Sequence, residues 1–333
     1  MALYTAAQTT YGQIGIREDL VDKVYRIDPE ETPFLSNISR NITVKNRLHE
    51  WTTQGLTAPA DNAQLEGDVA NATAVKDRVR IGNRTQISKK VYAVSGTSRE
   101  VTVAGIPDEL IEQRLLKKLE LKRDMEYSLL DNTIAAAGGT TTVRHLGGLA
   151  TYITNWDAGI TNFTISDGAG GVAWNFAAVT TGSARALSLA QLNTANYQAW
   201  IDGGKPNVLL LSGDKKIDFS QLALTATSGA VQLRFNIPPG QAKFITAVEG
   251  WLSDFGPLEV VPDPQMDLGA WWHQRTAYLV DSRYVGVGFL GKRNMLVEPL
   301  AKTGDANPEH VLSEYTLQVS APTAHALVPV LTA

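Results

Sequence analysis

Residues 286–291 read GVGFLG and match the G-x-G-x-x-G spacing that cradles a dinucleotide pyrophosphate. That chemistry needs a helix directly after the glycines, because the helix N-terminus faces the phosphates. Residues 292–299 instead have an extended pattern, and only about 40 residues follow the motif, too few for a dinucleotide-binding half-domain. We therefore expect these glycines to relieve crowding in a strand or to allow a bulge.

Other catalytic patterns are also missing from the sequence. The chain has no cysteine, which excludes disulfides, thiolate metal sites and cysteine nucleophiles. Residues 203–205 (GGK) are followed by proline, so they do not form a phosphate-binding loop. No G-x-S-x-G or H-E-x-x-H pattern occurs, although folding could still gather a triad or a metal cluster from distant residues.

We predict no catalytic residue, no cofactor-binding residue and no metal ligand. The histidines show no spacing that would place two of them on one helix face. Each is expected to be a surface or hydrogen-bonded side chain: His49, His145, His273, His310 and His325.

Charge is unevenly distributed between residues 48 and 99. The part up to residue 75 is acidic, and the rest is basic but lacks the interleaved aromatic residues of a single-strand DNA binder. Two explanations stay open, a solvated hairpin with balanced faces and a contact between the acidic and basic halves of neighbouring copies. The candidates for inter-subunit contact are Glu50, Trp51, Asp61, Glu66, Asp68, Lys76, Arg78, Arg80, Arg84, Lys89 and Lys90.

Two alternating runs, residues 42–51 and 79–91, predict the strands of a long hairpin. Residues 57–74 between them have no apolar periodicity, and a loop of this length without structure of its own is usually functional or mobile. Residues 1–40 are polar and weakly patterned up to TPFL at positions 32–35. We interpret this first segment as an extended arm that is anchored at its end.

A helical pattern of about 31 residues covers residues 107–137 and predicts a rod of ~46 Å. Pro107 suits a first turn, and the glycines at 138–139 suit a helix end. Charges three residues apart predict ion pairs between Lys117 and Glu120 and between Arg123 and Glu126. One buried stripe is predicted from Ile111, Leu115, Leu116, Leu119, Met125, Leu129, Leu130 and Ile134.

The rest of the chain mixes helices and strands without a regular βαβ rhythm, which predicts an α+β fold. Residues 151–185 hold Trp156 and Trp174 among turn-forming residues and are interpreted as a protruding β insertion. Helices are expected at residues 187–201 and 214–222, and strands at 207–211, 243–248, 256–261, 276–280, 285–290 and 313–319.

Hydrophobic residues make up 44% of the chain, charged residues make up 19%, and the net charge is −4. This composition is typical of a soluble globular protein. A chain so close to neutral has no global attraction for nucleic acid or anionic lipid, so any DNA contact is expected to be local and weak. No run approaches the ~20 apolar residues of a membrane span, and residues 1–15 have no signal-peptide pattern.

Four groups of short segments carry a family resemblance. They are TPFL (32–35) followed by HEW (49–51), LNT (192–194) with WIDGGKP (200–206), FGPLEVV (255–261), and LAKTGDA (300–306) with EYTLQV (314–319). Their order and the predicted elements resemble the major capsid protein of tailed double-stranded DNA bacteriophages, which has the HK97-like fold. The insertion at 151–185 departs from the pattern.

The resemblance implies a domain order along the chain. The segments are an N-terminal arm (1–45), an extended β-hairpin or E-loop (46–100), a peripheral domain with the spine helix (101–150), the β insertion (151–185), an axial domain (186–295), and a C-terminal return to the peripheral domain (296–333). The fold expected from the resemblance is therefore α+β, with a mixed α/β axial domain.

The resemblance also implies a structural protein without catalysis, which self-assembles into hexamers and pentamers of an icosahedral head around double-stranded DNA. The implied partners are other copies of the chain, a portal, scaffold or decoration proteins, and packaged DNA in weak nonspecific contact, with no cofactor and no membrane. The implied location is the virion, after assembly in the host bacterial cytoplasm. The alternatives are an encapsulin-like nanocompartment shell and, from another class, a cytosolic enzyme or carbohydrate-binding protein built on the aromatic insertion.

Overall fold

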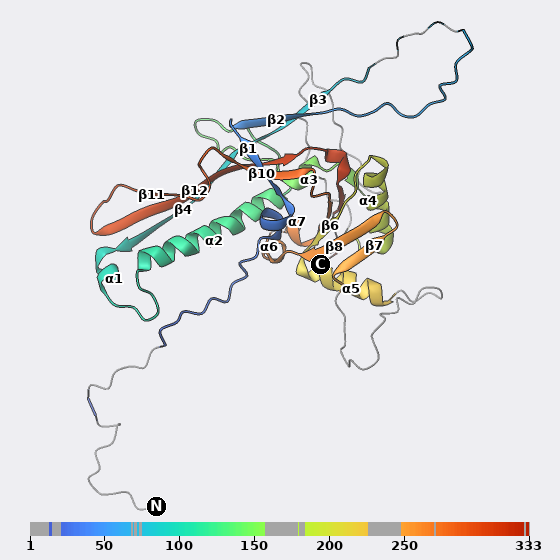
Figure 1. Cartoon of the computed structure of the whole chain (residues 1–333). Helices are drawn as coiled ribbons and strands as arrows, with labels where there is room; N and C mark the ends of the chain where they lie inside the picture. Colours follow the sequence, from blue (N-terminus) through green and yellow to red (C-terminus); the bar gives the residue numbers. More distant parts are fainter. Residues whose placement is uncertain are drawn as a thin grey trace, which may run out of the picture.

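The computed structural model describes residues 13–14, 21–67, 69, 72, 75–156, 179, 184–225, 248–269, 271–329 and 331–332. In this part of the chain the strands form two larger sheets and a separate two-stranded hairpin (Figure 1). The long helix α2 lies beside the first sheet, and shorter helices gather around the second (Figure 1). Helices and strands are thus mixed, as the predicted α+β class requires.

The first sheet, here called the peripheral sheet, has the strand order β1-β10-β12-β11, and β4 also pairs with β12. Its strands are β1 (Arg40–Val44), β4 (Gln86–Ser95), β10 (Val285–Leu290), β11 (Leu296–Pro299) and β12 (Ala306–Val319). On β4, Tyr92 and Val94 are buried on the side of α2, whereas Ile87 and Val91 point the other way and are exposed. One face of this sheet is therefore covered by α2.

Each of the two predicted hairpin strands is split in the structure: one part pairs within the hairpin, and the other part pairs with a strand of the peripheral sheet. Residues 42–44 belong to β1 and pair with β10, whereas β2 (Leu48–Thr53) pairs with β3 (Val79–Arg84). Beyond Thr85 the chain continues as β4, which leaves the hairpin and joins the peripheral sheet. The prediction is right for β2 and β3 and wrong for the flanking segments, because an alternating pattern indicates a strand but not its partner.

The helix α2 (Glu109–Leu130) is shorter than the predicted span of 107–137. Asp108 caps its N-terminus by accepting a hydrogen bond from a backbone N–H of the first turn, which leaves Pro107 outside the helix. At the other end the Asp131 carboxylate accepts hydrogen bonds from Asn132 N and the Thr133 hydroxyl. These local bonds compete with helical ones, so the chain continues in an extended conformation.

The predicted apolar stripe of α2 is buried only in its second half. Met125, Leu129 and Leu130 are at most 1% exposed, whereas Ile111 is 58% exposed and Leu115 is 45% exposed. The prediction is therefore wrong for the first half of the helix and for Ile134, which lies beyond the helix end and is 44% exposed. That half presents apolar side chains that packing within one chain does not cover.

One of the two predicted ion pairs on α2 is present. Lys117 Nζ lies 2.6 Å from Glu120 Oε1. The pair of Arg123 with Glu126 is wrong, because Arg123 donates to the Gln265 side chain and Glu126 points into the core. A glutamate on the buried side of a helix needs partners from other elements, and these are described below.

The second sheet, here called the axial sheet, has the order β5-β13-β9-β6-β8-β7. Its strands are β5 (Asn155–Trp156), β6 (Val208–Leu211), β7 (Gly250–Ser253), β8 (Gly256–Pro262), β9 (Ala277–Val280) and β13 (Ala326–Val328). The helices α4 (Leu189–Ile201) and α5 (Gly213–Thr225) pack against it, and α4 begins with a reciprocal capping box between Ser188 and Gln191. The other helical turns are η2 (Phe34–Ile38), α1 (Gly96–Glu100), α3 (Leu149–Tyr152), α6 (Pro264–Leu268), α7 (Trp271–Gln274) and η3 (Pro322–Ala324).

Most of the helices and strands predicted after residue 186 are confirmed in position and type. The exception is the strand predicted at 243–248, which lies almost wholly outside the described residues. The insertion at 151–185 also lies mostly outside them, including Trp174, although its first residues form the end of α3 and β5. The protrusion itself therefore stays a prediction.

The domain division also stays a prediction, but two strands cross its boundaries. β10, inside the predicted axial segment 186–295, pairs with β1 and β12 of the peripheral sheet. β13, inside the predicted peripheral return 296–333, pairs with β5 and β9 of the axial sheet. Both pairings join residues far apart in sequence, which a local pattern does not reveal.

The glycines of the G-x-G-x-x-G motif lie in β10, where β1 runs close alongside. A Cβ atom on Gly288 would lie 2.5 Å from Val44 Cγ2, and one on Gly286 would lie 2.6 Å from Ile42 Cγ2. Both approaches are closer than carbon atoms tolerate. The prediction that these glycines relieve crowding is confirmed, and the motif is followed by the strand β11 and not by a helix.

Candidate subunit interface

The base of the hairpin is fixed to the body by packing. Ile81 on β3 is fully buried, and the half-buried Trp51 on β2 packs against the same core. The Trp51 ring lies 6.2 Å from the ring of Tyr152, centroid to centroid. The Tyr152 hydroxyl in turn donates a hydrogen bond of 3.0 Å to Gly82 O, so the α3 segment holds the middle of β3.

Asn83 is the polar centre of this base. Its fully buried side chain donates to Gly147 O (3.0 Å) and to Leu317 O (2.8 Å). Its Oδ1 accepts from Gly147 N and from Arg84 N, each at 2.8 Å. One amide therefore joins β3, the segment before α3, and β12, and all of its hydrogen-bonding capacity is used.

A buried carboxylate, that of Glu314, extends this network to Thr85, the residue between β3 and β4. Glu314 on β12 is 2% exposed and accepts a hydrogen bond of 2.8 Å from the Thr85 hydroxyl. Arg144 and Arg293 donate to its two oxygens. Because the charge is paired on both sides, the junction between β3 and β4 is held rigidly.

The outer part of the hairpin, residues 54–78, is held differently. Gln54 Nε2 donates to Lys76 O at 2.9 Å, and Arg78 Nε donates to Gln54 Oε1 at 3.3 Å, which closes the neck of the loop. Beyond the neck the chain extends away from both sheets (Figure 1). Leu56 is 93% exposed and Leu65 is 82% exposed, so these side chains face solvent in the single chain.

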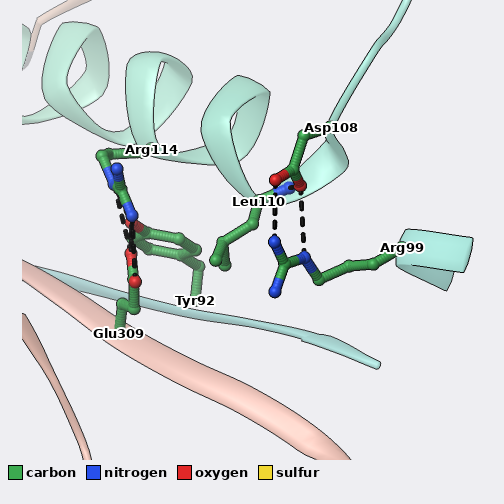
Figure 2. Close-up of polar contacts among 6 residues, drawn as sticks. All are labelled: Tyr92, Arg99, Asp108, Leu110, Arg114 and Glu309. Carbon is green, nitrogen blue, oxygen red and sulfur yellow. Dashed lines mark hydrogen bonds and ion pairs between the residues drawn. The ribbon is translucent and has the colours of Figure 1, made fainter. Parts of the chain in front are cut away.

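The far end of the peripheral sheet is clamped to α2 by a second polar cluster (Figure 2). Arg114 on α2 donates to both oxygens of Glu309 on β12, at 3.0 and 2.9 Å, and the Tyr92 hydroxyl donates to the same carboxylate. Burial raises the pKa of Glu309, but hydrogen bonds from Tyr92 and Arg114 lower it overall. Arg99 pairs with Asp108 at 2.8 Å and ties α1 to the start of α2.

The arm segment, residues 21–33, runs beside α2. Arg26 forms an ion pair with Glu112 on α2. Tyr25 is nevertheless 70% exposed and Ile27 is 95% exposed. The arm becomes part of the core only at Phe34, which is fully buried at the start of η2. The interpretation of residues 1–40 as an arm anchored at its end is therefore right for the residues that the structure describes.

The sequence matches the family model of the SU10 major capsid protein over residues 3–332. The chain belongs to this family. A curated major capsid protein of Escherichia phage Phieco32 is 32% identical over 122 residues, which cover 36% of this chain and about a third (34%) of that relative. Family membership gives the chain a structural role as a capsid protein, with its place in the virion.

Solved structures with this fold include chains of capsids. A chain of the cyanophage A-1(L) capsid asymmetric unit has a TM-score of 0.65 at 14% identity, with 96% of this chain and 98% of that chain covered. The capsid of a native GTA particle has a TM-score of 0.60 at 13% identity, with 98% and 100% covered. A structure titled Gordonia phage Cozz has a TM-score of 0.61 at 13% identity, with 96% and 92% covered. The predicted HK97-like fold is confirmed.

Several predicted contact residues of this capsid protein have partners within their own chain. Arg80 lies 3.5 Å from Glu50 across the hairpin, and Lys90 lies 2.6 Å from Asp124 on α2. Trp51 and the half-buried Arg84 belong to the base of the hairpin. These residues shape and position the hairpin, and their role in contacts between subunits stays a prediction.

Other predicted contact residues are exposed. Asp61 is exposed and accepts a hydrogen bond from Ala63 N, and Glu66 is exposed at a turn. Lys76, Arg78 and Lys89 are exposed, and within the described ranges no carboxylate lies at ion-pair distance from them. Asp68 lies outside the described residues.

The residues that could do chemistry are dispersed. In the described part of the chain no three histidine, aspartate or glutamate side chains gather as a metal-binding group. His325 is buried, its Nδ1 accepts a hydrogen bond from Asp281 N, and burial lowers its pKa to about 4. None of the helices described is both long and apolar enough for a bilayer crossing.

Proposed function

We propose that this capsid protein assembles into hexamers and pentamers that close into an icosahedral shell around double-stranded DNA. The observation that supports this most is the outer part of the hairpin. It carries large apolar side chains 82–93% exposed at Leu56, Leu65 and Val75, on a base that is rigidly held. An element of this kind buries its apolar surface only against another molecule.

The arm and the first half of α2 provide further uncovered surface on the same chain. Ile27 on the arm and Ile111 on α2 are more than half exposed, although both lie in segments with regular contacts to the body. Stable interfaces between permanent partners commonly bury more than ~2,000 Å², and several limbs on one subunit can supply that area together. Many moderate contacts per subunit then sum to a durable shell.

Charge favours other copies of the chain as the occupant of these surfaces. The outer loop carries Asp61 and Glu66, whereas Lys76 and Arg78 lie on its return side, exposed and without an acidic partner in the described part of the chain. When the hairpin of one subunit contacts a neighbouring subunit, opposite charges at its two ends allow only one alignment of the two surfaces.

The same proposal includes the finer partners expected from the family. We propose a portal, scaffold or decoration proteins, and packaged DNA in weak nonspecific contact, because a net charge of −4 does not bind a polyanion strongly. Assembly is proposed in the cytoplasm of the host bacterium, without a cofactor and without catalysis. No specific observation favours the nanocompartment, or the enzyme and carbohydrate-binding alternatives.

The test removes the apolar character of the outer loop. In Leu56→Ser with Leu65→Ser, we expect a folded chain that no longer forms megadalton particles in light scattering and electron micrographs. The control is Thr57→Ala with Ala60→Ser, two mild changes in the same loop, which should assemble as the unchanged chain does. Normal particles from the double serine variant would contradict the proposal.

A further inference from the structure

Two carboxyl groups meet in the core where the arm enters the body. Glu126 on α2 is fully buried. Its Oε1 accepts a hydrogen bond of 2.7 Å from Phe34 N, and its Oε2 accepts one of 2.8 Å from Leu35 N. Both oxygens therefore hold the first turn of η2, which is the root of the arm. Two backbone N–H donors favour a carboxylate over a neutral acid at this position.

The second carboxyl belongs to Asp263, directly before α6. It is fully buried, and its Oδ1 caps α6 by accepting from Gln265 N at 2.8 Å. Its Oδ2 is also buried, and no N–H or hydroxyl group of the described residues donates to it. The Glu126 carboxyl lies within hydrogen-bond reach of this group. Two carboxyls can form a hydrogen bond only if one of them carries a proton.

α6 holds the arm at a second place. The Gln265 side chain donates to Pro29 O and to Glu31 O, each at 3.1 Å. Its amide oxygen accepts from Arg123 Nε on α2 at 3.0 Å. Since the backbone of the same residue is fixed by Asp263, the two carboxyls and Gln265 together hold residues 29–35 of the arm.

We propose that Glu126 and Asp263 share one proton and act as a clasp, which fixes the arm root to α2 and α6 and releases it when the proton is lost. The proton stays with Glu126, the carboxyl with the higher pKa, and is shared with Asp263 Oδ2, which has no other partner among the described residues. With the proton, the pair carries one negative charge that two N–H donors stabilise. Without it, two like charges face each other in the core.

The surroundings of the pair do not supply a compensating positive charge. On α6 the nearest charged group is Asp267, which adds repulsion, and on β9 the buried Tyr278 is neutral and donates to Leu130 O. On α2, Arg123 is engaged with Gln265, and on α7 His273 contacts Tyr127. On η2 the pair meets backbone N–H groups, and among the described residues no lysine or arginine forms an ion pair with either carboxyl.

The direction of the pH dependence follows from this environment. Burial raises the pKa of Glu126, and burial also raises the pKa of Asp263 to about 6. The folded arm root therefore binds more protons than the released one at intermediate pH. Its stability is full in acid, below the ordinary carboxyl range, and is lost as the pH rises above about 6 toward the higher pKa of Glu126. Acid closes the clasp, and mild alkali opens it.

The inference concerns the single chain, so it is tested on unassembled protein and does not depend on shell formation. Hydrogen exchange of peptides spanning residues 29–38 is measured at about pH 5 and about pH 8, after correction for the intrinsic rate. We expect exchange at the higher pH to be faster by about tenfold or more. Peptides from β12 (Ala306–Val319) report in the same experiment whether the body stays folded.

Two variants separate the roles of the carboxyls. Asp263→Asn places a permanent donor beside the Glu126 carboxylate and can still cap α6, so exchange should be slow at both pH values. Glu126→Gln replaces one acceptor by an NH2 group that faces a backbone N–H, so exchange should be fast at both. Glu120→Gln removes a charge from the exposed side of the same helix and should behave as the unchanged chain.

Exchange of residues 29–38 that is independent of pH in the unchanged chain would overturn the clasp. A pH dependence that persists in Asp263→Asn would also overturn it, because another group would then be responsible. If Glu126→Gln does not fold, as judged by the β12 peptides, the comparison with Asp263→Asn decides alone.

Discussion

The base and the outer part of the hairpin belong to one continuous element, yet they differ in how they are stabilised. At the base, Ile81 and Asn83 are fully buried and every polar atom of Asn83 has a partner in the body. In the outer part, Leu56 and Leu65 face solvent, and the hydrogen bonds between Gln54, Lys76 and Arg78 that close its neck come from within the hairpin itself. The base fixes the direction in which the hairpin leaves the body, and the outer part exposes an apolar surface.

This contrast between base and outer part shows that the exposed apolar side chains of the hairpin do not result from poor packing of the chain. A limb that simply lacked a core would be loosely attached, whereas this one leaves the body beside Asn83 and Glu314, two buried side chains whose polar atoms all have hydrogen-bond partners. The same contrast occurs on α2, whose second half is buried and whose first half exposes Ile111 and Leu115. Rigid attachment and apolar exposure together are the properties that an assembling subunit requires.

The largest effect on stability is expected at the base of the hairpin. Asn83→Ala leaves buried groups of Gly147 and Leu317 without partners and should lower the free energy of unfolding by about 3 kcal/mol. Asn62→Ala, an exposed position in the outer loop, should change it by less than about 0.5 kcal/mol. Denaturant unfolding of the unassembled chain measures both. Equal effects would show that base and outer loop are not distinct.

Charge reversal in the outer part should affect assembly and hardly affect folding. Lys76→Glu with Arg78→Glu should reduce the yield of particles, while the free energy of unfolding changes by less than about 0.5 kcal/mol. Lys76→Arg with Arg78→Lys keeps the charge and serves as the control. Particle yield is measured by sedimentation at low and at high salt, since salt weakens exposed charge contacts. Unchanged yield of the reversed variant would remove the electrostatic part of the proposal.

The sequence predicts elements better than partners. Alternation identified β2 and β3, and the missing periodicity after residue 57 agrees with the absence of helix and strand in the described residues 57–67. The ends of α2 were predicted too widely, because the bonds of the Asp131 side chain decide where the helix stops. Lys90 was predicted as an inter-subunit contact from the basic charge of residues 76–99, and its ion pair with Asp124 was not predicted because Asp124 lies on another element.

The buried polar groups were the hardest to predict. Nothing near Asn83 in sequence indicates that its partners lie 64 and 234 residues away. Glu126 left a weak signal, because it stands next to Met125 and three residues before Leu129, on the side of the helix that is buried. A charged residue within an apolar stripe is therefore a reason to expect a specific partner, and here the partners are the arm root and Asp263.

Hydrogen exchange of residues 54–67 in unassembled chains and in particles tests the central claim most directly. If other copies complete the outer part of the hairpin, its amides should exchange freely in the unassembled chain and at least about tenfold more slowly in particles. The base, residues 79–84, should be protected equally in both states. Fast exchange of residues 54–67 in intact particles would contradict the account.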